Sequence, residues 1–296
     1  MIRNIFASTA LLACAVASPA FAQMDLSKVE ITAEELAPGV AALFGEGGNM
    51  AVSYGEDGTI LIDDQYAPLS DKISIAIKQL GASPVKMLVN THWHGDHSGG
   101  NENFAMAGAT IFAHDNVRVR MSNPHTRSTG TILPASPKAA LPIVTYDRGV
   151  TFHLNGDTID VIATSGGHTD GDSIVVWREK NIVHMGDLYF NLGGWPFLDM
   201  VSGGNAHNML LSMDTALGLM DENTKVIPGH GPMSNKAEML ANRLMLGEAF
   251  DRIAALKKQG MTLEEAQAAK PLTSFNRSEG FVTADMFIAA VWKSID

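Results

Sequence analysis

Residues 90–101 read "NTHWHGDHSGGN" and place four ligand-type side chains within six positions: His92, His94, Asp96 and His97. Side chains at alternate positions of an extended segment point the same way, so His92 and His94 can converge on one point. After the glycine that follows, Asp96 and His97 can face a neighbouring point. Four such groups cannot all close around one ion without strain, so the stretch predicts two adjacent metal ions.

Three further loops carry residues that could complete these sites. His168 lies in "TSGGHTDGDS", between two predicted strands, and Asp187 lies in "NIVHMGDLYF", at a strand end. His230 lies in "VIPGHGP", also at a strand end. Ligands on loops at the ends of a rigid sheet are well preorganised for metal binding. Imidazole and carboxylate both bind zinc, so these three residues are the predicted partners.

Four motifs in this order, HWHGDH, GGHTDGD, GD and PGHG, make the chain resemble the metallo-β-lactamase superfamily from about residue 40 to about residue 232. The resemblance implies an αββα sandwich and a site for two zinc ions (Zn2+). It implies that one zinc is held by His92, His94 and His168. It implies that the second is held by Asp96, His97 and His230, with Asp187 bridging the two.

The strand and helix patterns indicate an α+β fold. Short apolar runs separated by Gly-rich turns predict an antiparallel meander over residues 40–65, followed by a helix with Ser70 as its candidate N-cap. Residues 125–142 are predicted to form a long surface loop, and a second series of strands is predicted over 142–186. Two mixed β-sheets packed together, with outer helices, account for this order.

Residues 1–22 have the form of a signal peptide, with cleavage predicted after Ala22. The remainder, residues 23–296, is expected to form a single metallo-β-lactamase-like domain with C-terminal helices over about 235–296. We therefore expect a periplasmic or secreted protein. Cys14 is the only cysteine, and "LLAC" leaves a lipid anchor open as an alternative. Cleavage after Ala22 would leave no cysteine for a disulfide or a thiolate ligand.

The net charge of −11 argues against a nucleic-acid partner and against docking on an anionic membrane surface. After the signal peptide, no stretch reaches about 18 apolar residues, so stable membrane insertion is not expected. The expected partner is a small-molecule substrate. The oligomeric state stays open.

A zinc-bound water has a pKa of about 7, so the predicted site favours a hydrolase in which a metal-bridging hydroxide attacks a carbonyl. The expected substrate is a β-lactam-like cyclic amide, a lactone or an ester. Asp96 is close enough to orient the nucleophile or to shuttle a proton. Tyr189 could stabilise an oxyanion, and Trp195, Pro196 and Phe197 could form an apolar wall for the substrate, unless these residues simply cover the core.

Departures from the best-known family members keep the substrate open. Asp187 stands where the principal β-lactamases carry a cysteine, and the whole ligand set is more like that of hydroxyacylglutathione hydrolases and lactonases. Predicted export counts against the glutathione thioesterases, which are usually cytoplasmic. An iron-dependent persulfide dioxygenase and a non-catalytic metal-binding protein of the same fold are further alternatives. The native metal, whether zinc, iron or manganese, is not fixed by the sequence.

Overall fold

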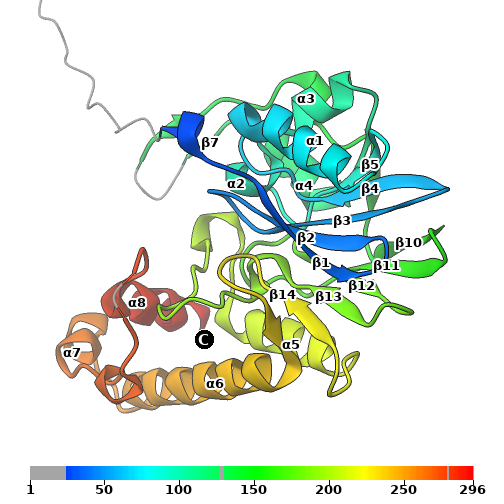
Figure 1. The fold of residues 1–296 in the computed structure, drawn as a ribbon. Coiled ribbons are helices and arrows are strands. Elements are labelled where there is room, and N and C mark those ends of the chain that lie inside the picture. The colour runs from blue at the N-terminus through cyan, green and yellow to red at the C-terminus, as the bar shows by residue number, and fades with distance from the viewer. Residues whose placement is uncertain (1–24, 127–129, 279, 296) are drawn as a thin grey trace, which may run out of the picture.

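The computed structural model describes residues 25–126, 130–278 and 280–295. The predicted signal peptide and Cys14 lie outside these residues. Two β-sheets pack against each other, and helices cover the outer face of each sheet (Figure 1). This is the αββα sandwich that the sequence predicts, and the α+β fold class is confirmed.

The first sheet has seven strands and is mixed. Across the sheet they are β1 (Thr32–Ala37), β2 (Val40–Phe44), β3 (Met50–Gly55), β4 (Gly58–Ile62), β5 (Val85–Val89), β6 (Thr110–His114) and β9 (Val144–Tyr146). The first four form an antiparallel meander, and β4, β5, β6 and β9 pair in parallel. The meander is the one predicted from the glycine-separated apolar runs, with β1 added at its edge.

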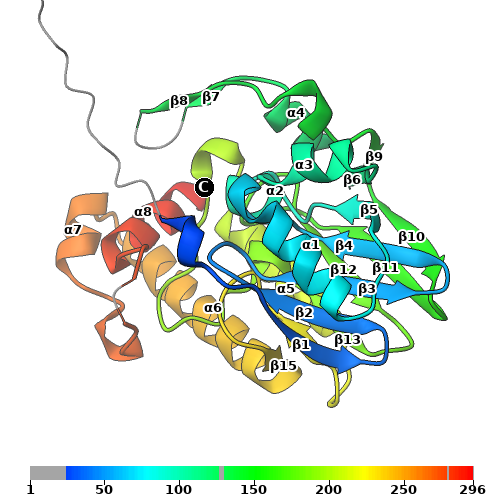
Figure 2. The ribbon, with the colours of Figure 1, turned by 45° about the horizontal axis from the view of Figure 1, so that its top comes forward.

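The second sheet has six strands. Across the sheet they are β10 (Gly149–Leu154), β11 (Asp157–Ala163), β12 (Ser173–Trp177), β13 (Ile182–His184), β14 (Lys225–Ile227) and β15 (Ser234–Asn235). Neighbours are antiparallel except β13 and β14, which are parallel. Two further short strands, β7 (His125–Thr126) and β8 (Ile132–Leu133), pair with each other and project beside the first sheet (Figure 2).

The helices divide between the two outer faces. Those on the side of the first sheet are α1 (Ser70–Gln79), α2 (Gly95–Ser98), α3 (Asn101–Met106) and α4 (Asp115–Met121). Those on the side of the second sheet are α5 (Ala206–Leu217), α6 (Lys236–Lys258), α7 (Leu263–Ala268) and α8 (Ala284–Ser294). The short 3-10 helices are η1 (Leu26–Lys28), η2 (Ala67–Leu69), η3 (Lys138–Ala140), η4 (Gly186–Leu188), η5 (Met200–Ser202) and η6 (Thr273–Phe275).

Three buried apolar layers hold the sandwich together. Between the sheets, Ile60 packs in one cluster with Trp177. Its neighbour Leu61 points to the other face of β4 and joins Ile73 of α1, as the alternation along a strand requires. The outer helices of the second sheet contribute Phe287 and their other apolar residues to a third cluster. Burying each large side chain contributes about 1.5–3 kcal/mol, so the strand ends are firmly placed.

Three local predictions need correction. β9, predicted with the second series of strands, lies in the first sheet beside β6, because its partner is set by tertiary packing rather than by its own sequence. The predicted loop over 125–142 contains the β7–β8 hairpin. Ser70 does not cap α1 but is its first residue: η2 precedes it directly, and the Ser70 hydroxyl donates to Ala67 O at 2.9 Å.

The C-terminal helices form where the sequence predicts them. Thr262 and Glu265 make the predicted capping box at the start of α7, and the Thr283 hydroxyl accepts from the Met286 N–H at the start of α8. Within the described residues, no helix is both long enough and apolar enough to cross a membrane.

Candidate metal centre

The loops that carry the predicted ligands leave strands of both sheets and meet in one place. β5 leads into the loop with His92 to His97, and β13 leads into η4, which contains Asp187. His168 lies between β11 and β12, and His230 follows β14. The Ser173 N–H donates to Thr91 O at 2.8 Å, which ties the two sheets together beside the site. The core therefore preorganises side chains that are far apart in sequence.

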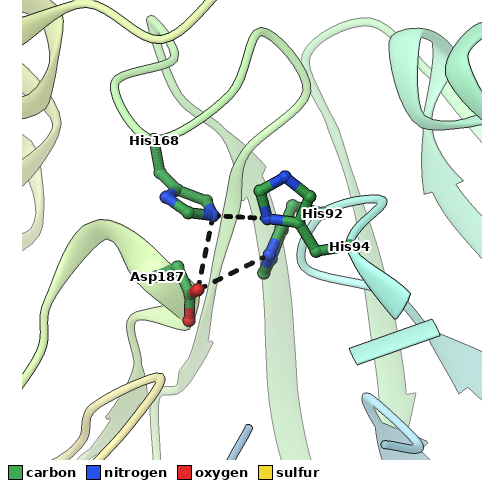
Figure 3. A group of neighbouring side chains, drawn as sticks. All are labelled: His92, His94, His168 and Asp187. Carbon is green, nitrogen blue, oxygen red and sulfur yellow. Dashed lines mark hydrogen bonds and ion pairs between the residues drawn. The ribbon is translucent and has the colours of Figure 1, made fainter. Parts of the chain in front are cut away.

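Four of the predicted ligands form a first group: His92, His94, His168 and Asp187 (Figure 3). One ligand atom of each lies within 4.8 Å of the others. His168 Nε2 is 2.8 Å from His94 Nδ1 and 3.3 Å from Asp187 Oδ2. His92 Nε2 is 3.7 Å from the same Asp187 oxygen and is a buried atom without a hydrogen-bond partner among the described residues.

The remaining three predicted ligands form a second group: Asp96, His97 and His230. His230 Nε2 is 3.3 Å from His97 Nε2 and 3.3 Å from Asp96 Oδ2. The second oxygen of Asp187, Oδ1, faces this group at 3.0 Å from His97 Nε2 and 3.4 Å from His230 Nε2. The two oxygens of Asp187 thus point at different groups, as a carboxylate bridging two ions would.

The sequence profile of the Metallo-beta-lactamase superfamily matches residues 44–233, which is more than half of the chain. The chain belongs to the metallo-β-lactamase superfamily. The matched range contains all seven predicted ligands and ends before α6, so the C-terminal helices lie outside it.

Relatives and solved structures point the same way. A probable metallo-hydrolase of Bacillus subtilis is 28% identical over 167 residues, 54% of this chain and 75% of that protein. A hydroxyacylglutathione hydrolase of Polaromonas sp. is 26% identical over 243 residues, 79% of each chain. A solved metallo-β-lactamase from Pontibacter korlensis superposes with a TM-score of 0.62 at 19% identity, covering 74% of this chain and 99% of that one. The superfamily and these relatives support a metal-dependent hydrolase, while the structural likeness shows the fold alone.

The hydrogen bonds of His94 and His168 leave ring nitrogens free to bind a cation. The His168 ring donates through Nδ1 to Phe197 O at 2.8 Å, since a carbonyl oxygen can only accept. The His94 ring donates through Nε2 to the Asp199 carboxylate at 2.9 Å. With both rings neutral, His94 Nδ1 and His168 Nε2 direct lone pairs at each other across 2.8 Å. These lone pairs repel unless a cation accepts both, so the residues present fit a bound metal ion.

Two carboxylates orient the ligand rings from behind, and the sequence analysis found neither. Asp199 bonds His94 in the first group, and Asp63 bonds His97 Nδ1 in the second at 2.7 Å. Asp63 is fully buried and also accepts from the Thr91 N–H and hydroxyl, both at 2.7 Å. Such outer partners fix the ring tautomer and raise the basicity of the ligand nitrogen. Asp63 lies inside the predicted strand-like run "TILIDDQ" at residues 59–65, and its place directly after the apolar residues is the available signal.

Burial and charge act differently on the two groups. Burial lowers the pKa of His168 to about 4 and that of His92 well below its usual value. In the second group burial also acts to lower the pKa values, but the carboxylates outweigh it. Asp187 and Asp96 raise the pKa of His230 to about 9, and Asp187, Asp63 and Asp96 raise that of His97 well above its usual value.

At two glycines the backbone approaches the ligand side chains closely. A β-carbon at Gly48 would collide with the ring of His97, and one at Gly229 would collide with Asp187 Oδ1. Gly48 also donates its N–H to Asp96 O at 3.0 Å. These contacts fix ligand positions in both groups, and no residue with a side chain fits in place of either glycine.

Tyr189 and Trp195 are buried outside the ligand groups. The Tyr189 hydroxyl lies 3.0 Å from Ser234 Oγ, which donates to Glu238 at 2.8 Å. Trp195 stacks on Phe287 of α8 with ring centroids 4.6 Å apart. Both placements favour a packing role over the predicted oxyanion and substrate-wall roles. Phe197, predicted together with Trp195 as part of that wall, does lie next to the ligand rings His94 and His168, and Phe190 lies next to His230.

Proposed function

We propose that the protein is an exported, dinuclear zinc-dependent hydrolase that cleaves a carbonyl substrate such as a β-lactam-like cyclic amide, a lactone or an ester. The observation that carries this proposal is the placement of Asp187, whose Oδ2 faces the first group and whose Oδ1 faces the second. Zinc at the two groups would supply an acidified water and polarise the scissile carbonyl. His92, His94 and His168 would hold one ion, and Asp96, His97 and His230 the other.

The exposure of the ligands indicates the side from which substrate approaches. Asp96 and His230 are 26% and 22% exposed, whereas His92, His97 and His168 are almost completely buried. Asp96 therefore stands at the boundary between the cluster and solvent. His97 and His230 lower the pKa of its carboxyl to about 2 against the effect of burial, so it is ionised at neutral pH. In this proposal the ionised Asp96 carboxylate orients the attacking water.

Export rests on the sequence of residues 1–22, with its small-x-small motif at Ala22. From this motif we infer that the enzyme acts in the periplasm or outside the cell. Mass spectrometry of the protein recovered from the cytoplasmic, periplasmic and membrane fractions checks this. A mature N-terminus at Gln23 in the periplasm supports export as a soluble protein, and an acylated N-terminus at Cys14 in the membrane supports the lipid anchor instead. A cytoplasmic protein that keeps residues 1–22 contradicts export.

Thioester hydrolysis is a second candidate, favoured by the 26% identity with a hydroxyacylglutathione hydrolase over 79% of the chain. Both candidates use the same ligand set, and they differ in the leaving group. They are separated by the substrate and not by the metal centre.

The test measures metal content and turnover on one preparation of the mature protein. Elemental analysis is expected to give two zinc ions per chain. A chromogenic cephalosporin, a lactone, 4-nitrophenyl esters and a glutathione thioester are then assayed with and without a chelator. Chelator-sensitive cleavage of an ester, lactone or cyclic amide supports the proposal, and cleavage of the thioester alone replaces it by the second candidate. Two bound zinc ions with no turnover of any substrate would contradict both.

A further inference from the structure

We propose that an apolar rim formed by Phe190, Leu192, Phe197 and Phe281 selects substrates with an uncharged, apolar group next to the scissile bond. This inference rests on the proposed hydrolase function and names the substrate class that the same site takes. Three of the rim residues follow Asp187 in the chain, and the fourth comes from the segment between α7 and α8.

Two rim rings lie directly against ligand rings. The Phe197 centroid is 6.1 Å from that of His94 and 5.8 Å from that of His168. The Phe190 ring stacks on His230 with centroids 5.4 Å apart and an interplanar angle of 2°. His94 and His230 belong to different ligand groups, so aromatic surface borders both predicted ion positions. A substrate whose carbonyl reaches both ion positions would therefore lie close to these rings.

Phe281 extends this surface outward. Its ring lies 5.6 Å from that of Phe197, centroid to centroid, yet 82% of the residue is exposed. Leu192 is also exposed and lies close to the ligand loop, since a β-carbon at Gly231, next to His230, would be 3.2 Å from Leu192 Cδ2. Large apolar side chains left in water at the entrance of a site are typical of a surface that a ligand covers.

The segment that carries Phe281 is tied to the loop after Asp187. Arg277 donates through Nε to Gly194 O at 2.7 Å and through Nη2 to Leu192 O at 3.0 Å. The Ser278 N–H donates to Gly193 O at 3.1 Å. These bonds hold the rim in place before any substrate arrives, which lowers the entropic cost of binding. Phe281 lies outside the range matched by the family profile, so this part of the rim belongs to the C-terminal extension.

The arginines bonded to this loop are already engaged. Arg277 donates hydrogen bonds to backbone carbonyls, and Arg120 forms a bidentate ion pair with Asp170, with bonds of 3.1 and 2.6 Å. The carboxylates of Asp96 and Asp199 also lie beside the ligand rings. An acyl chain or ring without charge therefore suits the rim better than a group that carries carboxylates, such as glutathione.

The test compares acyl chains on one leaving group. The zinc-loaded wild type and Phe281→Ser are assayed with 4-nitrophenyl acetate, 4-nitrophenyl octanoate and the 4-nitrophenyl monoester of adipic acid. We expect the wild type to prefer the octanoate to both other esters by about tenfold or more in kcat/KM, mainly through KM. Phe281→Ser should lose most of this preference, chiefly through a higher KM for the octanoate. Met106→Ser, at a residue 78% exposed on α3, is the matched control and should keep the preference.

A binding measurement separates this inference from the proposed function. Calorimetry of the zinc-loaded protein with acetohydroxamate and octanohydroxamate should give about tenfold tighter binding of the longer chain, and Phe281→Ser should remove that difference. Ester hydrolysis without chain-length preference, together with equal hydroxamate affinities, overturns the rim and leaves the hydrolase standing. Retained chain-length dependent binding with no chelator-sensitive hydrolysis supports the rim and overturns the hydrolase.

Discussion

The two ligand groups share one carboxylate but differ in their surroundings. In the first group burial dominates and lowers the pKa of His168 to about 4. In the second, Asp187 and Asp96 outweigh burial and raise the pKa of His230 to about 9. The first group is therefore ready to bind a cation at neutral pH, whereas the second must first release protons. Burial thus dominates the pKa values of His92 and His168, and nearby carboxylates dominate those of His97 and His230.

The largest effect on zinc content and hydrolysis is expected at Asp187, the ligand that both groups share. Asp187→Ala removes an oxygen from each group, so zinc content should fall below two per chain and hydrolysis should fall on the order of a thousandfold. Elemental analysis and steady-state kinetics on the same preparation check this. Full activity with two zinc ions retained would remove the bridging role of Asp187.

Lowering the pH should remove zinc from the second group before it removes zinc from the first. The raised pKa values of His97 and His230 mean that both carry protons at neutral pH without metal, and zinc must displace them. Zinc affinity of the second group should therefore fall by up to about a hundredfold for each pH unit lost below neutrality. In the first group, protons should compete with zinc for His168 only as the pH approaches about 4, so this group should lose its ion at a lower pH than the second. Zinc content after dialysis at pH 7, 6 and 5 measures this, and simultaneous loss of both ions would contradict it.

Asp63→Asn should weaken the second group more than the first, because Asp63 contacts His97 directly and reaches His92 only through the Thr91 hydroxyl. It removes the charged partner of His97 and disturbs the two bonds from Thr91, so zinc affinity there should fall about 10- to 100-fold. The free energy of unfolding should also fall by about 1–3 kcal/mol, because the site is fully buried. Competition with a chromophoric chelator and urea unfolding provide the two readouts. A weaker first group with an unchanged second would show that the assignment is reversed.

Asp199→Asn tests the corresponding contact in the first group. Asp199 is less buried than Asp63 and is also held by the Ser202 hydroxyl at 2.6 Å, so we expect a smaller loss of about tenfold in zinc affinity. Asp214→Asn, which breaks a pair with Arg243 at the outer helices, is the control and should leave zinc binding unchanged. Equal zinc affinities in Asp199→Asn and the wild type would mean that the Phe197 carbonyl and the ring packing alone orient this group.

Much of the fold and of the metal centre could be predicted because its signals are local. The ligand loop after β5 and the glycine-marked loops with His168 and His230 are each visible in a few consecutive residues. The meander and the Thr262 capping box are local in the same sense. The structure brings all seven predicted ligands together, although the assignment of each to a particular ion stays a prediction.

The remaining features depend on contacts between distant segments. Asp199 lies more than 100 positions from His94. Phe281 reaches the site because Arg277 ties its segment to the loop after Asp187. β9 could not be assigned to a sheet from its three residues alone. The Tyr189 hydroxyl lies beside Ser234, which is 45 positions away in the sequence. No short sequence pattern records these contacts.

The close contact of Gly48 and Gly229 with the ligands has a consequence for mutational tolerance. Any side chain at these two positions displaces His97 or Asp187, so random variation there should yield inactive proteins almost without exception. Phe281 is exposed and lies outside the ligand groups, so many residues can replace it without loss of metal. A saturation library would keep position 281 diverse and positions 48 and 229 invariant. In the proposed enzyme, substrate scope can therefore change by single substitutions while the ligand positions stay fixed.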